Sequence, residues 1–190
     1  MTEHPLLLFL DVEAGGLPTV SGKALSFDFP ILCLDAVLWH PDQGKIASSG
    51  TIYFDDDELN DSSSAYEMHQ ASGLLDRWRQ AERIGFEQAD EMLVSMIDSI
   101  VGTKPAVLLA GNSVGGYDLP IVQIHLPRLH QRLRHRALDT SSLRHPAAAF
   151  EVDLDERTRA AGGVYDHTSS SDVAYCIKMY EQFLDLMKES

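Results

Sequence analysis

An uninterrupted apolar run near the start of the chain limits the possible folds more than any other feature. Residues Leu6 to Leu10 are all apolar, and the acids Asp11 and Glu13 follow closely. Such a run is typical of a strand buried on both faces, because a half-exposed strand alternates apolar and polar side chains. Layers must therefore cover both sides of this strand, which predicts a sheet between helices.

The rest of the chain supplies further elements for this sheet. The expected strands cover 6–10, 30–40, 45–54 and 106–110, and the expected helices cover 85–101, 118–133 with a break at Pro127, and 169–187. A turn at 41–44 joins the second strand to the third, which indicates an antiparallel meander. The acidic, serine-rich stretch 55–64 predicts a surface loop. We expect residues 1–190 to form a single α/β domain.

Composition and cysteine use narrow the class of protein. Fifteen Lys and Arg against 29 Asp and Glu give a net charge of −14, which argues against a protein that coats long nucleic acid but allows a short nucleic-acid ligand. Cys33 and Cys176 match no zinc or redox spacing, so we expect reduced core thiols in a cytoplasmic protein. The sequence predicts neither a signal peptide nor a membrane span.

Asp11 and Glu13 are the first candidates for chemistry. Alternate residues of a strand share a face, so both carboxylates point to the same side. Neighbouring buried carboxylates repel unless a cation lies between them, and Mg²⁺ and Mn²⁺ prefer such hard oxygen ligands. The alternative is that both acids are simply solvated at the end of a strand.

Three later residues extend this acidic set. Asp118 follows a second apolar strand, and His167 precedes Asp172 by five positions. Five residues apart on one helix would point the two side chains in divergent directions, so a shared site requires His167 to lie in the loop before the helix. A histidine there suits a general base. Alternatively, Asp118 caps a helix ahead of Pro120, and Asp172 belongs to a capping arrangement beginning at Ser169.

In this order the five residues resemble the DEDDh family of 3′-to-5′ exonucleases, whose motifs are D-x-E, a central Asp and H-x4-D. The resemblance implies a ribonuclease-H-like α/β domain with a central mixed sheet of five strands flanked by helices. It also implies two divalent ions, Mg²⁺ or Mn²⁺, and a histidine that takes a proton from the attacking water. The implied metal ligands are Asp11, Glu13, Asp118 and Asp172, and the implied base is His167.

Further stretches are similar to the oligoribonuclease branch of that family, which cleaves very short oligoribonucleotides. They are the segments 7–17, 69–74, 111–113 and 136–143. This similarity implies an exoribonuclease that degrades short oligoribonucleotides, possibly dinucleotides, to mononucleotides as a cytoplasmic homodimer with no membrane partner. The implied substrate-binding residues are Leu17 against a base, His69, and a 5′-phosphate cap of Ser113, Arg136 and Ser141.

Several positions depart from the pattern of that branch. Ser64 stands where the branch has an aromatic residue that packs on a base, and Tyr66 is a candidate substitute. His135 stands where the branch has tyrosine before the capping arginine, and an extra residue precedes Asp118. Arg136 also has a simpler interpretation, as part of a solvated helical face over 128–136.

Other functions remain open at this point. The same catalytic set is compatible with an exonuclease that acts on DNA or longer RNA, or with an inactive relative that binds nucleotides. The segment around Ser113 also matches G-x-S-x-G, the nucleophile elbow of serine hydrolases. Asp139 or Asp153, followed by His167, would complete the chain order of a serine triad.

Overall fold

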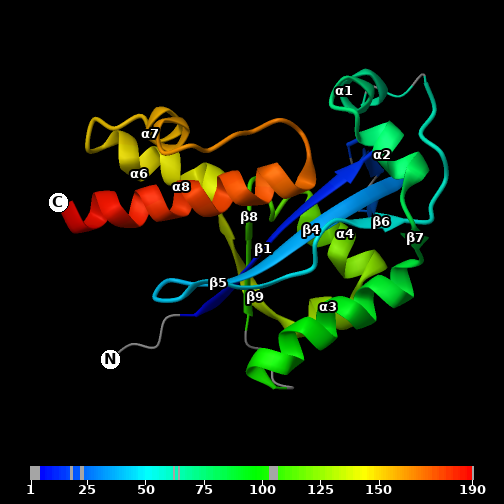
Figure 1. Ribbon diagram of the computed structural model, residues 1–190, viewed down its shortest axis with the longest axis horizontal. Coiled ribbons are helices and arrows are strands. Elements are labelled where there is room, and N and C mark those ends of the chain that lie inside the picture. The colour runs from blue at the N-terminus through cyan, green and yellow to red at the C-terminus, as the bar shows by residue number, and fades with distance from the viewer. Residues whose placement is uncertain are drawn as a thin grey trace.

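The fold is a mixed sheet with helices on both faces (Figure 1). The structure is a computed structural model that describes residues 5–17, 19–21, 24–61, 63, 65–102 and 107–189. Ser64 and the first residue of the strand expected at 106–110 lie outside these ranges. No helix in the described ranges is both long and apolar enough to cross a bilayer.

The sheet has the strand order β7-β6-β4-β1-β8-β9, with β5 also paired to β4. Its strands are β1 (Leu6–Ala14), β4 (Ile31–His40), β5 (Gly44–Ser48), β6 (Ile52–Phe54), β7 (Arg83–Ile84), β8 (Val107–Gly111) and β9 (Leu133–Asp139). The central strand β1 pairs antiparallel with β4 and parallel with β8. The antiparallel meander expected from the first three strands is confirmed, because β4 in turn pairs antiparallel with β5 and β6.

Within the described residues the sheet has seven strands, where the family resemblance implied five. The expected strand 45–54 is divided into β5 and β6, because Gly50 adopts a φ of 65° and turns the chain out of the ladder. Ser49 nevertheless stays bound to β4, since its N–H donates to the Ala36 carbonyl and its hydroxyl accepts from the Ala36 N–H. The two-residue strand β7 and the separate hairpin of β2 (Thr19–Ser21) and β3 (Ala24–Ser26) were not predicted.

Strand β1 is buried on both faces, as its apolar run predicts. Leu8 and Leu10 pack with α3 (Phe86–Val101), α4 (Asp118–His125) and α5 (Pro127–Arg132), whereas Leu7 and Phe9 pack with α8 (Ser169–Glu189). Figure 1 shows these helices on opposite sides of the sheet. Because successive side chains alternate, Asp11 and Glu13 continue the Leu7 and Phe9 face, toward α8.

The other helices complete the two layers. They are α1 (Tyr66–Ala71), α2 (Leu74–Gln80), α6 (Arg144–Ala148) and α7 (Leu154–Ala160), with a 3-10 turn η1 (Thr140–Leu143). The predicted helices at 85–101 and 169–187 and the break at Pro127 are confirmed. The predicted helical face over 128–136 is wrong, because the chain becomes strand β9 at Leu133 and exposes Arg136 on it. Both cysteines are buried and free.

Strands β1 and β8 approach each other closely beside the acidic end of β1. A Cβ atom on Gly111 would lie 2.6 Å from the Leu10 carbonyl oxygen and 3.2 Å from the Val114 side chain. Such contacts are too short for any side chain, so this position of β8 requires glycine. A Cβ on Gly115 would meet nothing within 4 Å.

Candidate active site

The end of β1, the start of α4 and the loop before α8 converge on one cleft of about 420 Å³. It is lined by all five residues of the exonuclease-like set, namely Asp11, Glu13, Asp118, His167 and Asp172, and also by Leu17 and Ser113. Residues separated by up to about 160 positions in the chain therefore share a single surface. Arg136, Ser141 and His69 are not among the described residues that line it.

Three carboxylates form the closest group in this cleft. Asp11 and Glu13 extend from β1 and Asp172 from the first turn of α8, with one oxygen of each within 4.8 Å of the others. Glu13 and Asp172 are buried. This donor set fits a hard dication, because carboxylates so close together and so poorly solvated require a cation to balance them.

Asp118 adds a fourth carboxylate, which is also buried. Its side chain accepts a hydrogen bond from the Val12 N–H at 2.9 Å, which ties the start of α4 to β1 between the two acids of that strand. The expectation that Asp118 caps α4 is wrong, because Tyr117 occupies the N-cap and Asp118 is the first helical residue. The carboxylate is instead directed at the acidic end of β1.

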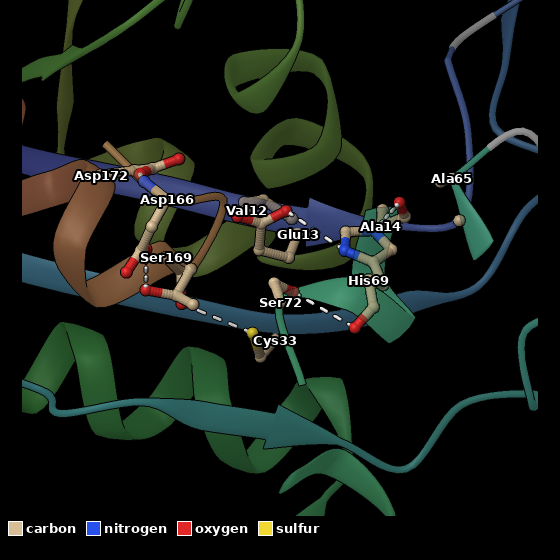
Figure 2. A network of polar contacts seen from close by, with 12 residues as sticks. Val12, Glu13, Ala14, Cys33, Ala65, His69, Ser72, Asp166, Ser169 and Asp172 are labelled. Atoms are coloured by element: carbon tan, nitrogen blue, oxygen red, sulfur yellow. Dashed lines mark hydrogen bonds and ion pairs between the residues drawn. The ribbon is translucent and has the colours of Figure 1, made fainter. Parts of the chain in front are cut away.

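His167 lies in the loop before α8, as the five-residue spacing requires, with a φ of 58°. Asp172 anchors this loop by accepting from the Asp166 N–H at 3.3 Å. Asp166 in turn accepts from the Thr168 hydroxyl at 2.7 Å and from the Ser171 hydroxyl. Figure 2 shows the resulting arrangement, with Glu13 between this loop and His69.

Burial disfavours the charged form of all four carboxyls, and repulsion from the others adds to this for Asp11, Glu13 and Asp118. Burial is the larger cause in each case; it raises the pKa of Glu13 to about 7 and that of Asp118 to about 8. The pKa of Asp11 is raised well above its usual value by burial and then by the charges of Asp118 and Glu13. The pKa of Asp172 is also raised by burial. The cleft is therefore short of positive charge.

This shortage predicts a stability profile for the metal-free protein. The folded protein holds protons that the unfolded chain releases above its ordinary carboxyl pKa, so unfolding free energy should fall as pH rises from 5 to 8. The shift of Glu13 from 4.5 to about 7 corresponds to about 3 kcal/mol. Urea denaturation in EDTA at several pH values measures the fall, and Glu13→Gln should remove that part of it. A profile that rises over this interval would contradict the prediction.

A second buried network beneath the cleft was not predicted. Asp35 lies opposite Asp11 in the β1–β4 ladder and is buried. It accepts from the Ser169 hydroxyl at 2.8 Å. The same hydroxyl is hydrogen-bonded to the Cys33 thiol at 3.4 Å (Figure 2). Ser169 is therefore committed to the sheet rather than to a capping arrangement for Asp172. The available signal was Asp35 itself, an acid inside an apolar strand.

His69 lies behind the cleft rather than in it. Its side chain is fully buried, and Nε2–H donates to the Ala14 carbonyl at 2.9 Å. Its Nδ1 atom lies 3.8 Å from a Glu13 carboxylate oxygen and has no hydrogen-bond partner. Burial lowers the pKa of His69. The ring is closed off from the cleft in this structure, and the expected substrate contact of His69 stays a prediction.

The three expected phosphate-cap residues are partly brought together. Ser113, with a φ of 55°, lines the cleft at the end of β8. The Asp139 carboxylate accepts from the Ser113 N–H at 3.0 Å and from the Ser141 N–H and hydroxyl at 2.9 and 2.6 Å. Asp139 therefore links the two serines, while Arg136 remains exposed on β9.

These contacts do not support the serine-hydrolase interpretation of Ser113. Asp139 is bound to two serines, and Asp153 caps α7 by accepting from the Glu156 N–H at 3.0 Å. Neither acid is thus available to orient His167 as a triad would require. The chain after Ser113 forms a turn, and α4 begins only at Asp118.

The aromatic and apolar residues that could contact a base differ in how exposed they are and in what they pack against. Leu17 is 77% exposed at the edge of the cleft. Tyr66 is partly buried against the cluster that includes Leu32 and Trp78 and is not among the described residues that line the cleft, so its role as a substitute aromatic residue stays a prediction. Tyr165, which lines the cleft, was not singled out by the sequence analysis.

Comparison with solved structures identifies the fold class. The chain superposes on the crystal structure of a full-length 3′-exonuclease with a TM-score of 0.62 and 15% identity, covering 98% of this chain and 84% of that one. The mixed sheet between helices is therefore the ribonuclease-H-like fold of such exonucleases, as the sequence predicted.

Sequence comparison finds similarity to oligoribonucleases. The chain is 26% identical over 168 residues to a probable oligoribonuclease of Schizosaccharomyces pombe, a match covering 88% of this chain and 62% of that protein's length. It is 31% identical over 77 residues to the oligoribonuclease of Corynebacterium diphtheriae, covering 40% of this chain and 36% of that protein. No family model matches the chain. The resemblance to oligoribonucleases that the motifs indicated is confirmed.

Proposed function

We propose that this chain is a metal-dependent 3′-to-5′ exoribonuclease that hydrolyses short oligoribonucleotides, down to dinucleotides, to nucleoside 5′-monophosphates. One observation carries the proposal: Asp11, Glu13 and Asp172 converge within 4.8 Å in the cleft that His167 also lines. A solvated strand end would not hold three carboxylates this close together with two of them buried. The similarity to oligoribonucleases supports the choice of substrate.

The residues of the cleft would have two roles in the reaction, metal binding and proton transfer. Asp11, Glu13, Asp118 and Asp172 would hold two Mg²⁺ or Mn²⁺ ions. When bound, such ions neutralise charge on a phosphodiester as it is displaced. His167 would accept the proton of the attacking water, since its loop position leaves the ring at the cleft surface.

Substrate positioning would fall to the edges of the cleft. Leu17 would pack against a base, and Ser113 would contact a phosphate. Arg136 and Ser141 would complete a cap for the terminal phosphate, with Arg136 as a bidentate donor. In that arrangement Asp139 orients the two serines. We also propose a homodimer that acts in the cytoplasm, to which the buried free thiols are suited.

The direct test follows product length with time. The protein is incubated with Mn²⁺ and 5′-labelled RNA of two and of about twenty nucleotides, with EDTA controls. Rapid, EDTA-sensitive cleavage of the dinucleotide and slow attack on the longer RNA are expected. A matching deoxydinucleotide tests whether the sugar is recognised. Stepwise shortening of long RNA or DNA that stops before the dinucleotide would favour a different exonuclease, and no metal-dependent cleavage would favour an inactive relative.

A further inference from the structure

The acidic cleft is bordered by exposed apolar side chains. Leu17 is 77% exposed, Tyr165 is 44% exposed and Met68 is 36% exposed, and all three line the cleft. Large apolar side chains gathered at a concave, otherwise polar surface mark a ligand site, because their exposure costs free energy that a ligand recovers.

The cleft lacks the usual means of holding a polyanion. Among the described residues that line it, none is lysine or arginine, whereas four are acidic: Asp11, Glu13, Asp118 and Asp172. The side chains that line this surface therefore contribute little phosphate neutralisation themselves, which leaves that part of binding to the proposed ions and to Arg136 outside the cleft. What the lining side chains can add is contact with the uncharged bases.

Tyr165 is the aromatic side chain best placed for such a contact. Its ring centroid lies 5.1 Å from that of His167 at 75° and 5.5 Å from that of Tyr175 at 69°. Two near-perpendicular ring contacts hold the side chain in place although it is substantially exposed. An aromatic ring held in this way loses little conformational freedom when a base stacks on it.

We propose that Tyr165 is a specificity residue that stacks on a nucleobase of the bound oligonucleotide, on the His167 side of the cleft. This inference rests on the proposed function, and it assigns an aromatic base contact to a tyrosine two positions before His167. The nucleobase contact makes the enzyme sensitive to the presence of a base next to the scissile phosphate.

The ring contact with His167 allows one competing role, in which Tyr165 only orients that histidine. The two roles differ in what they change. Loss of a base contact raises KM for substrates that carry the base, whereas loss of orientation lowers kcat for every substrate. Tyr165→Phe keeps the ring in both cases, so Tyr165→Ala is the informative variant.

Steady-state kinetics separates these roles. For a dinucleotide, Tyr165→Ala should raise KM about tenfold, the order expected for one lost base stack, and leave kcat within about threefold. Tyr165→Phe should behave as the unmodified protein. For a dinucleotide with one base removed, the KM values of the unmodified protein and of Tyr165→Ala should be similar. Phe150→Ala is the matched control, because Phe150 is also 44% exposed but lies outside the cleft. An equal fall of kcat on both substrates, or an unchanged KM, would overturn the proposal.

A binding measurement separates this proposal from the proposed function. The probe is 2-aminopurine ribonucleoside 5′-monophosphate with Mg²⁺, a mononucleotide that the exonuclease cannot shorten. Stacking on the unmodified protein or on Tyr165→Phe should quench its fluorescence. Half-maximal quenching should require a concentration of Tyr165→Ala about tenfold higher than that of the unmodified protein. Quenching by a protein that cleaves no RNA would reject the nuclease and support the base site. Cleavage of RNA with identical quenching by Tyr165→Ala would keep the nuclease and reject the base site.

Discussion

Asp11→Asn should reduce cleavage of a dinucleotide by about a thousandfold or more while the metal-free protein stays at least as stable as before. The carboxylate is one of three that converge within 4.8 Å, so its loss removes a metal ligand and with it several kcal/mol of stabilisation of the displaced phosphodiester. In the absence of metal, however, Asp11 is repelled by its neighbours and its pKa is raised mainly by burial. Removing that charge relieves the repulsion.

Two measurements on one preparation check this expectation. Initial rates with Mn²⁺ report cleavage, and urea denaturation in EDTA at pH 8 reports stability. Asp42→Asn is the control, because Asp42 is an exposed acid in the turn between β4 and β5 and should change neither quantity. Full activity of Asp11→Asn would remove the metal-ligand assignment, and a large loss of stability would show that Asp11 has a structural role instead.

His167→Asn should lower kcat by about 10² to 10⁴-fold, the range typical of a lost general base, without loss of metal binding. Asparagine suits the site because it tolerates the left-handed backbone that His167 adopts, with its φ of 58°. Alanine would add backbone strain and confuse the result. The amide cannot accept a proton from water at neutral pH.

The check combines rates with a binding readout. Rates with saturating dinucleotide give kcat, and the rise in melting temperature with added Mn²⁺ gives metal binding, which should be retained because the carboxylates are intact. His145→Asn is the matched control, since His145 is exposed on α6 and does not line the cleft. A His167→Asn protein that cleaves normally would rule out His167 as the base.

Sequence patterns were sufficient where the determining interactions are local. The apolar run before Asp11 predicted a strand buried on both faces, since period-two alternation fixes which side chains face α8. Helical spacing predicted α3 and α8, and the divergence of residues five apart on a helix placed His167 in a loop. These inferences need only short stretches of chain.

Other features depend on partners far away in the chain. Strand β9 contains the charged or polar run Arg134, His135 and Arg136. An edge strand tolerates such side chains, so their pattern does not distinguish this strand from a solvated helix. The burial of His69 depends on the carbonyl of Ala14, 55 positions earlier. No local pattern distinguishes such a histidine from one that faces a ligand.

The missing side chain at Gly111 has a consequence for how the cleft responds to metal. Because the backbone of β8 rests against the Leu10 carbonyl, the strand bearing Asp11 cannot move toward or away from its neighbour without breaking the ladder. His69 restrains the same strand at Ala14. The backbone that carries Asp11 and Glu13 thus cannot yield to relax their repulsion, and this part of the site is preorganised: ions that enter it need little rearrangement of β1.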